Sequence, residues 1–280
     1  MMLRALLLAA LSSTGLAAEC TREFLKASAD SLLAAQTAGD PSLLKPAPAD
    51  AFAAYNENQK TAAFKTGILK TAIKIDHSRH SLDTTQCATF TEIISATGPK
   101  PYVIGVQLWF TDGAVSKIDS IVTSTGDWLF NVTGTLSWAR KEAWDVIPVE
   151  KRDTRAVIQA GADAYLDIFN DKKVVVPWGK PCARLEGGAY TGNGGPNDRC
   201  DVGIPDGVKL TNRHYVIDET VGAVDVMLTF ASLADSHEFR LEGGKLRFVH
   251  TMTPMGGSRG PTVGGKGKGR RRSGGATVYM

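Results

Sequence analysis

The stretch DSHEFRLEGGKLRFVHTM, residues 235–252, consists of two alternating polar and apolar runs on either side of Gly243-Gly244. Side chains alternate between the two faces of a strand, and a Gly-Gly pair favours the tight turn of a β-hairpin. Counting outward from a two-residue turn places His237 directly opposite His250. We therefore expect the two imidazoles on one face of a hairpin, about 5 Å apart at Cβ.

The face that carries both histidines is otherwise apolar, with Phe239, Phe248 and Met252 expected to contact a bound molecule. Burial disfavours a charged imidazole, so at least one of the pair could act as a base near neutral pH. Two other interpretations stay open. The pair could be purely structural, or it could bind a metal if His214 or Asp218 supplied a third ligand.

The chain reads as one supersecondary unit present twice. Residues 24–40 and 153–173 have the apolar spacing of amphipathic helices, and each leads through a proline-bearing connector into a series of strands. Each series has a glycine-containing turn before its last strand. We expect an α+β fold of two tandem units, residues 19–150 with a Trp-rich connector and residues 151–253, each with helices packed on a curved antiparallel sheet.

The first half differs from the second at the position of the histidine pair. Counting outward from Asp112-Gly113 places Val106 opposite Asp119, on the strand face of Val115 and Ile121. Upstream, strand alternation in the segment IDHSRH places His77 and Arg79 on one face and Asp76 on the opposite face. An ion pair is the favoured interpretation of that segment, and a second polar cavity is the alternative.

Residues 177–200, PWGKPCARLEGGAYTGNGGPNDRC, are expected to form a long loop tied by two cysteines. In that loop Trp178 and Tyr190 could cap a pocket, and Glu186 could serve as an acid or a base. The alternative is a surface loop held only by a disulfide and a packed Trp.

Several features favour an exported protein. Residues 1–18 have one basic residue, an apolar run and a small-residue end, as in a signal peptide, and no later segment is long and apolar enough to span a bilayer. Asn131 begins an Asn-Val-Thr glycosylation sequon. The four cysteines allow three connectivities, and with two in each half we favour Cys20 with Cys87 and Cys182 with Cys200. No CxxC pair is present, so a zinc ribbon is not favoured.

The net charge of +3 comes from the end of the chain. Residues 254–280 carry six basic residues and no acid, and without these and Arg4 the count is 25 Lys and Arg against 29 Asp and Glu. We expect this Gly-rich end to be disordered, and nothing in the remainder suggests nucleic-acid binding.

Three segments, GADAYLDIFNDKKVVVPWGKPCARLEGGAYTG (161–192), NRHYVIDETVGAVDVMLTF (212–230) and DSHEFRLEGGKLRFVHTMT (235–253), resemble a secreted fungal family with a conserved domain of unknown function. The resemblance extends from Cys20 to Thr253, and the basic end departs from it. That family is similar in pattern to the SnoaL-like, or NTF2-like, cone fold. The resemblance implies a superfamily of cyclases, dehydratases and isomerases that use His, Asp and Tyr in an apolar cone, generally without a cofactor.

We therefore expect a cofactor-independent isomerase, cyclase or dehydratase acting on a small apolar secondary-metabolite intermediate, with no metal and no cofactor. His237 and His250 would be the acid/base pair and Asp218 an orienting residue. A secreted protein that binds a small molecule without chemistry is one alternative, and a structural or effector-like secreted protein with a filled core is another.

Overall fold

The computed structural model describes residues 20–256 of the chain. The expected signal peptide and most of the basic Gly-rich end lie outside the described residues. No helix in the described part is long and apolar enough to cross a membrane.

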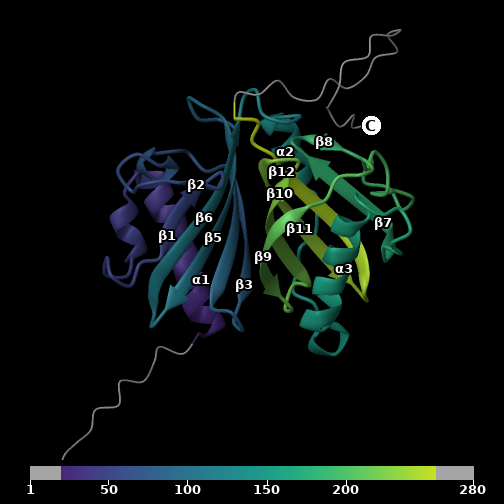
Figure 1. Ribbon diagram of the computed structural model, residues 1–280, viewed down its shortest axis with the longest axis horizontal. Helices are drawn as coiled ribbons and strands as arrows, with labels where there is room; N and C mark the ends of the chain where they lie inside the picture. The colour runs from purple at the N-terminus through teal and green to yellow at the C-terminus, as the bar shows by residue number, and fades with distance from the viewer. Residues whose placement is uncertain (1–19, 257–280) are drawn as a thin grey trace, which may run out of the picture.

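Residues 20–256 form two six-stranded mixed sheets (Figure 1). The first sheet has the order β2-β1-β6-β5-β4-β3 and comprises β1 (Ala54–Glu57), β2 (Lys60–Thr61), β3 (His77–Asp83), β4 (Ala88–Ser95), β5 (Tyr102–Thr111) and β6 (Ala114–Ser124). The second has the order β8-β7-β12-β11-β10-β9 and comprises β7 (Trp178–Glu186), β8 (Ala189–Tyr190), β9 (Thr211–Asp218), β10 (Ala223–Phe230), β11 (Leu233–Glu242) and β12 (Lys245–Met252).

The two sheets share one topology. In each, four strands form an antiparallel meander, and the strand that enters beside the last of them runs parallel to it: β1 beside β6 and β7 beside β12. Two sheets of the same topology support the expected α+β arrangement of two units. Each sheet is mixed, however, where the sequence predicted an antiparallel one, because the strand that follows the helix joins its sheet in parallel.

One helix packs on the outer side of each sheet. The predicted helices are confirmed as α1 (Arg22–Ala38) and α3 (Arg155–Asp167), of which α3 ends six residues before its predicted end. Thr21 caps α1 by accepting the Phe24 amide, and Thr154 caps α3 in the same way. The buried positions of α1 recur every three or four residues and face the first sheet, as those of α3 face the second.

The two sheets face each other between these helices, which makes four layers: α1, first sheet, second sheet, α3 (Figure 1). A third apolar cluster fills the space between the sheets and draws on both, including Phe90 and Ile121 of the first and Val216 and Met252 of the second. The Trp-rich connector contributes α2 (Val132–Ala139), whose N-cap is Asn131.

The predicted cross-strand histidine pair is wrong because the hairpin contains a β-bulge. Pairing begins as counted from the turn, but the register shifts at Arg240 and Leu241, so that one extra residue of β12 is accommodated. Beyond the bulge Glu238 lies opposite His250, and His237 lies opposite Thr251. Since a one-residue shift exchanges the faces of a strand, the two histidines point to opposite sides of the second sheet.

The first hairpin has a bulge at the corresponding place. The register of β5 and β6 shifts at Trp109 and Phe110, so Val106 faces Ser120 and Asp119 faces Gln107. The expected pairing of Val106 with Asp119 is therefore wrong for the same reason. The equivalent bulges are a further likeness between the two halves.

The structure confirms both predicted disulfides. Cys20 and Cys87 tie the start of α1 to the turn before β4, and Cys182 and Cys200 tie β7 to the segment before β9. The expectation of a long loop over 177–200 is wrong in its first part, since β7 and β8 occupy residues 178–190. Prolines, glycines and charges concealed a strand that pairs with β12.

Candidate active site

His237 lies on the side of β11 that faces α3, inside the second half. Its side chain is buried, and its ring lies 5.9 Å from that of Tyr165 between centroids. The Nδ1 atom lies 2.8 Å from Oδ2 of Asp235, two residues earlier on the same strand face. This close contact does not meet hydrogen-bond geometry, and neither atom has a hydrogen-bond partner in residues 20–256.

Asp235 is fully buried and accepts a hydrogen bond of 2.8 Å from Oγ1 of Thr253. Burial raises the pKa of its carboxyl, and the neighbouring His237 opposes that rise. A carboxylate beside Nδ1 favours a proton on that nitrogen. The lone pair of the neutral ring is then on Nε2, where it can accept a proton.

Three more polar side chains approach the same place. Arg184 of β7 donates to the Tyr165 hydroxyl from Nη1 over 3.2 Å, and to Glu186 from Nε over 3.1 Å. Glu186 also accepts a hydrogen bond of 2.7 Å from Nε1 of Trp128. Burial raises the pKa of Tyr165, so its phenol keeps its proton near neutral pH and can donate it.

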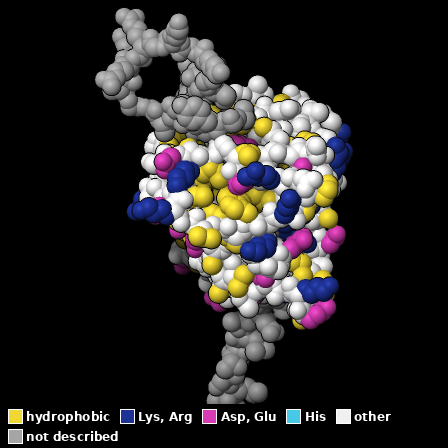
Figure 2. Space-filling model, turned by 90° about the vertical axis from the view of Figure 1, so that its right-hand side faces the viewer, with side chains coloured by type: hydrophobic (Ala, Val, Ile, Leu, Met, Phe, Trp, Pro, Cys, Tyr) yellow, Lys and Arg dark blue, Asp and Glu magenta, His cyan; other side chains and the backbone are white. Residues whose placement is uncertain are grey.

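These groups line a small, partly open cavity of about 20 Å³. Such a volume is of the order of a single water molecule. The remaining lining is largely apolar, from Phe169 and Phe230, and is closed by Gly203 and Pro205 of the segment between β8 and β9. Figure 2 shows hydrophobic side chains with Lys and Arg among them on the outer face of the second half, and no histidine on that face.

His250 lies elsewhere, between the two sheets. Its Nδ1 lies 3.0 Å from Glu92 and its Nε2 lies 2.6 Å from Glu142. Burial alone would lower the pKa of His250, but the two carboxylates outweigh it and raise the pKa to about 10. A charged ring with both nitrogens engaged has no lone pair to offer, so the geometry assigns His250 to the interface between the halves.

Arg79 of β3 completes that buried cluster. It lies 2.7 Å from Glu92 of its own sheet and 2.8 Å from Glu238 of the other, and its guanidinium lies 3.5 Å from the ring centroid of Trp144. The ion-pair interpretation of the IDHSRH segment is therefore confirmed for Arg79, whose carboxylate partners are buried.

Asp218 lies at the end of β9 and also joins the two halves. It accepts two hydrogen bonds from Arg22, of 2.8 and 2.9 Å, and one from the backbone amide of Leu82. Asp218 is not among the residues that line the His237 cavity. At the corresponding place in the first half, Asp83 accepts two bonds from Arg155, of 2.8 and 2.7 Å, and one from the Ile217 amide.

The other residues predicted to contact a ligand are likewise divided between the two sides of the second sheet. Phe239 and Trp178 pack on Tyr165, whereas Phe248 stacks on Trp144, Met252 packs against the first sheet, and Tyr190 stacks on Trp138. The structure thus brings His237 together with Glu186, but leaves Tyr190 and Trp178 out of the cavity lining.

Sequence reasoning missed Asp235, Tyr165 and Arg184. Strand alternation places Asp235 on the face of His237 and could have found it. Tyr165 and Arg184 come from α3 and from a segment interpreted as a loop, so no local pattern connects them to the hairpin.

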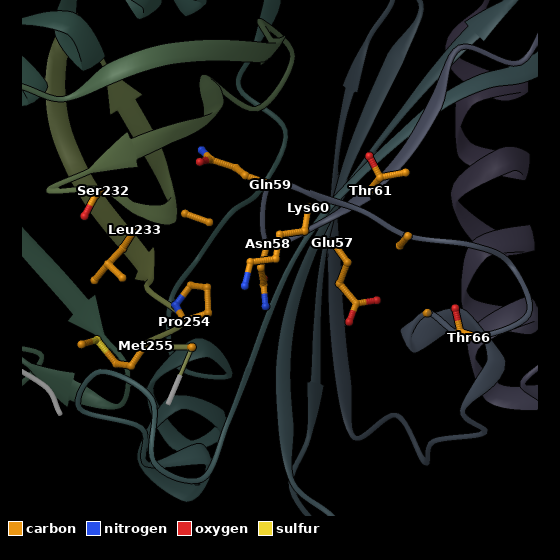
Figure 3. Close-up of a pocket in the computed structure, with 14 residues that line it drawn as sticks. Glu57, Asn58, Gln59, Lys60, Thr61, Thr66, Ser232, Leu233, Pro254 and Met255 are labelled. Carbon is orange, nitrogen blue, oxygen red and sulfur yellow. The ribbon is translucent and has the colours of Figure 1, made fainter. Parts of the chain in front are cut away.

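A larger cavity, of about 610 Å³, is a cleft between the halves (Figure 3). Figure 3 shows Ser232, Leu233, Pro254 and Met255 on one side and Glu57, Thr61 and Thr66 on the other, with the β1–β2 turn between them. The turn residues are already engaged: Asn58 bonds the backbone of Val122, and Gln59 donates to the Leu228 carbonyl. This cleft holds no acid/base pair. Within the described part of the chain, no group of three or more His, Cys, Asp or Glu side chains is placed to hold a metal.

A family model described as a domain of unknown function, DUF8021, matches residues 151–253. That range contains α3, the whole second sheet and the His237 cavity. No curated protein and no solved structure matches the chain.

Proposed function

We propose that the second half is a cofactor-independent acid/base enzyme, an isomerase, cyclase or dehydratase, acting on a small apolar metabolite. The observation that carries the proposal is the buried Asp235–His237 pair, with Nδ1 and Oδ2 2.8 Å apart, facing a cavity beside the phenol of Tyr165. A base and a proton donor around one cavity are the parts that proton transfer requires.

Each side chain has a distinct role in this proposal. His237 removes a proton through Nε2, and Asp235 orients the ring and stabilises the imidazolium that forms. Tyr165 donates its hydroxyl proton, or a hydrogen bond, to the oxygen on which negative charge develops. Arg184 donates to the Tyr165 oxygen and thereby leaves the phenol hydrogen for the substrate.

The NTF2-like cone remains part of this proposal. In its support, each half has a helix packed on one face of a six-stranded sheet, and the second half has a small cavity between helix and sheet. The cavity has room for only a water-sized group. In this proposal a substrate therefore enters when the segment of Gly203 and Pro205 moves away from Phe230. That segment lies outside the strands, so its displacement breaks no sheet pairing.

Secretion also remains a proposal. Two disulfides within the described residues support it, since such bonds persist in oxidising compartments. Asn131 is exposed at the start of α2, where a glycan could be attached. Expression through a secretory pathway should yield a protein that loses mass on amidase treatment, and Asn131→Gln should abolish that loss. An unchanged mass in the wild-type protein would refute the glycosylation.

The enzymatic proposal is tested by following α-proton exchange of 2-tetralone, a small apolar ketone, in deuterated water by NMR. His237→Gln and Tyr165→Phe should each lower the protein-catalysed rate by about 100-fold or more. His80→Gln is the matched control, because His80 lies on β3 and hydrogen-bonds Thr91. Equal rates in all four proteins would refute the acid/base roles.

The small cavity favours one second candidate, a structural or effector-like secreted protein whose second half is filled. In that case no rate exceeds that of buffer. The His237→Gln substitution would then change only the free energy of unfolding.

A further inference from the structure

A second cavity, of about 380 Å³, opens where the two sheets meet near the β1–β2 turn. The first half contributes Asn56, Asp119 and Ile121 to its lining, and the second half contributes Asn212, His214 and Met227. Its volume lies in the range of small-molecule sites, roughly 300–1,000 Å³. The cavity exists only because the halves are packed together, and it is separate from the His237 cavity.

The polar groups of this inter-half cavity are partly free. Asp119 is 8% exposed; its Oδ1 accepts a hydrogen bond of 2.8 Å from Asn56, and its Oδ2 has no hydrogen-bond partner in residues 20–256. The imidazole of His214 lies 3.9 Å from that oxygen and is half exposed. Asn212 is exposed and also lines the cavity, and its side-chain amide donates a hydrogen bond of 3.2 Å to Oγ1 of Thr229.

The charge of the cavity is balanced. Nζ of Lys117 lies 2.6 Å from Oδ2 of Asp119, in a contact outside hydrogen-bond geometry that still neutralises the carboxylate. A cationic or anionic ligand would therefore find no unpaired opposite charge here. A neutral ligand with hydroxyl groups can donate to Asp119. It can also accept from the second N–H of the side-chain amides of Asn56 and Asn212, whose first N–H groups bond Asp119 and Thr229.

The floor of the cavity is apolar. Ile121 of β6 and Met227 of β10, 1% and 5% exposed, line it from the two sheets. They offer a surface to the C–H face of a ring, beside the polar wall that would engage its hydroxyls.

We propose that this cavity binds a neutral, hydroxyl-bearing ring, namely a monosaccharide unit. The ring would rest on Ile121 and Met227, and adjacent hydroxyls would bond Asp119 and His214. This inference goes beyond the proposed acid/base function and does not depend on it, because His237 contributes nothing to this cavity.

The test is ligand-observed saturation-transfer NMR on the whole chain, with methyl α-D-glucopyranoside, methyl β-D-glucopyranoside, methyl α-D-mannopyranoside and N-acetylglucosamine as probes. At least one sugar should bind saturably. Asp119→Asn and His214→Ala should each weaken that binding about tenfold, the loss expected when a hydrogen bond to a charged or buried partner is removed.

Two variants serve as controls. Asp112→Asn, in the exposed turn before β6, should leave sugar binding unchanged, as should His237→Gln. Thermal melts establish that each variant is folded, and His214→Ala alters only a half-exposed side chain.

Four outcomes contradict the proposal. The first is that no sugar binds up to its solubility limit. The second is binding that is unchanged in both Asp119→Asn and His214→Ala. The third is binding abolished by His237→Gln, which would place the sugar in the His237 cavity. Choline and acetate are run in parallel, and Asp119-dependent binding of either would contradict the neutral site.

Discussion

At the scale of single residues, the two histidines of one hairpin have opposite environments. His237 has one carboxylate beside one nitrogen and a cavity beyond it, whereas His250 has a carboxylate at each nitrogen. In the proposed function, the first arrangement leaves a lone pair for chemistry. The second fixes a positive charge between the sheets.

Removing the His250 charge should destabilise the protein. His250→Gln leaves Glu92 and Glu142 without their shared cation in a buried site, so we expect the free energy of unfolding to fall by about 3–5 kcal/mol. Chemical denaturation of both proteins measures the difference. A loss no larger than that of His80→Gln would contradict this role.

The same substitution should change the pH dependence of stability. The pKa of His250 is raised from 6.5 to about 10 in the folded protein. A raised pKa contributes stability that is fully present below 6.5 and is lost as the pH rises through about 10. The stability difference between wild type and His250→Gln should therefore shrink over that window. A difference that stays constant there would contradict the assignment.

At the scale of elements, one inserted residue in each hairpin determines which side chains reach which layer. The turns themselves pair as counted from the sequence, with Leu241 opposite Leu246. The shift follows within two residues in both hairpins, at Arg240 and at Trp109. Without the bulges, Glu238 and His250 could not face each other between the sheets.

Deleting Arg247 tests the role of the second bulge. The deletion removes the extra residue but leaves Phe248 opposite Arg240 and His250 opposite Glu238, so a regular hairpin with the same faces results. We expect the deletion variant to keep cooperative unfolding at a cost of about 1–3 kcal/mol, and Arg247→Ala, which keeps the bulge, to cost less than about 1 kcal/mol. The two variants are compared by urea denaturation. Loss of cooperative unfolding in the deletion variant would refute the account of the bulge.

The helices, the hairpins, the internal repeat and both disulfides could be predicted from periodicity, turn residues and cysteine placement. The faces of the last strands could not, because nothing in KLRFVHTM marks Arg247 as an inserted residue. Strand β7 was missed because its Gly179 and Pro181 are typical of loops. The cluster around Arg79 joins residues far apart in the chain, and local patterns do not report such contacts.

At the scale of the whole molecule, the two halves are joined by reciprocal ion pairs as well as by an apolar cluster. Arg22 of the first half holds Asp218 of the second, and Arg155 of the second holds Asp83 of the first. Each carboxylate also accepts a backbone amide of the opposite edge strand, β3 or β9. Each half therefore supplies a carboxylate that stabilises the edge strand of the other half.

Breaking one of these pairs should weaken the whole protein. Asp218→Asn leaves Arg22 without its carboxylate partner, and we expect a loss of about 2–5 kcal/mol that lowers the stability of both halves together. Hydrogen exchange of amides in α1 and α3 measures the two halves separately. Faster exchange confined to the second half would contradict the coupling.

The central claim, that His237 is poised as a base, is tested most directly by the nitrogen-15 NMR signals of its ring. In its neutral form the ring should carry its proton on Nδ1, beside Asp235, and have a bare Nε2 toward the cavity. Asp235→Asn should disturb that tautomer, and His80→Gln should not. A proton on Nε2 in the wild-type protein would contradict the claim, because His237 would then have no lone pair to present to a substrate.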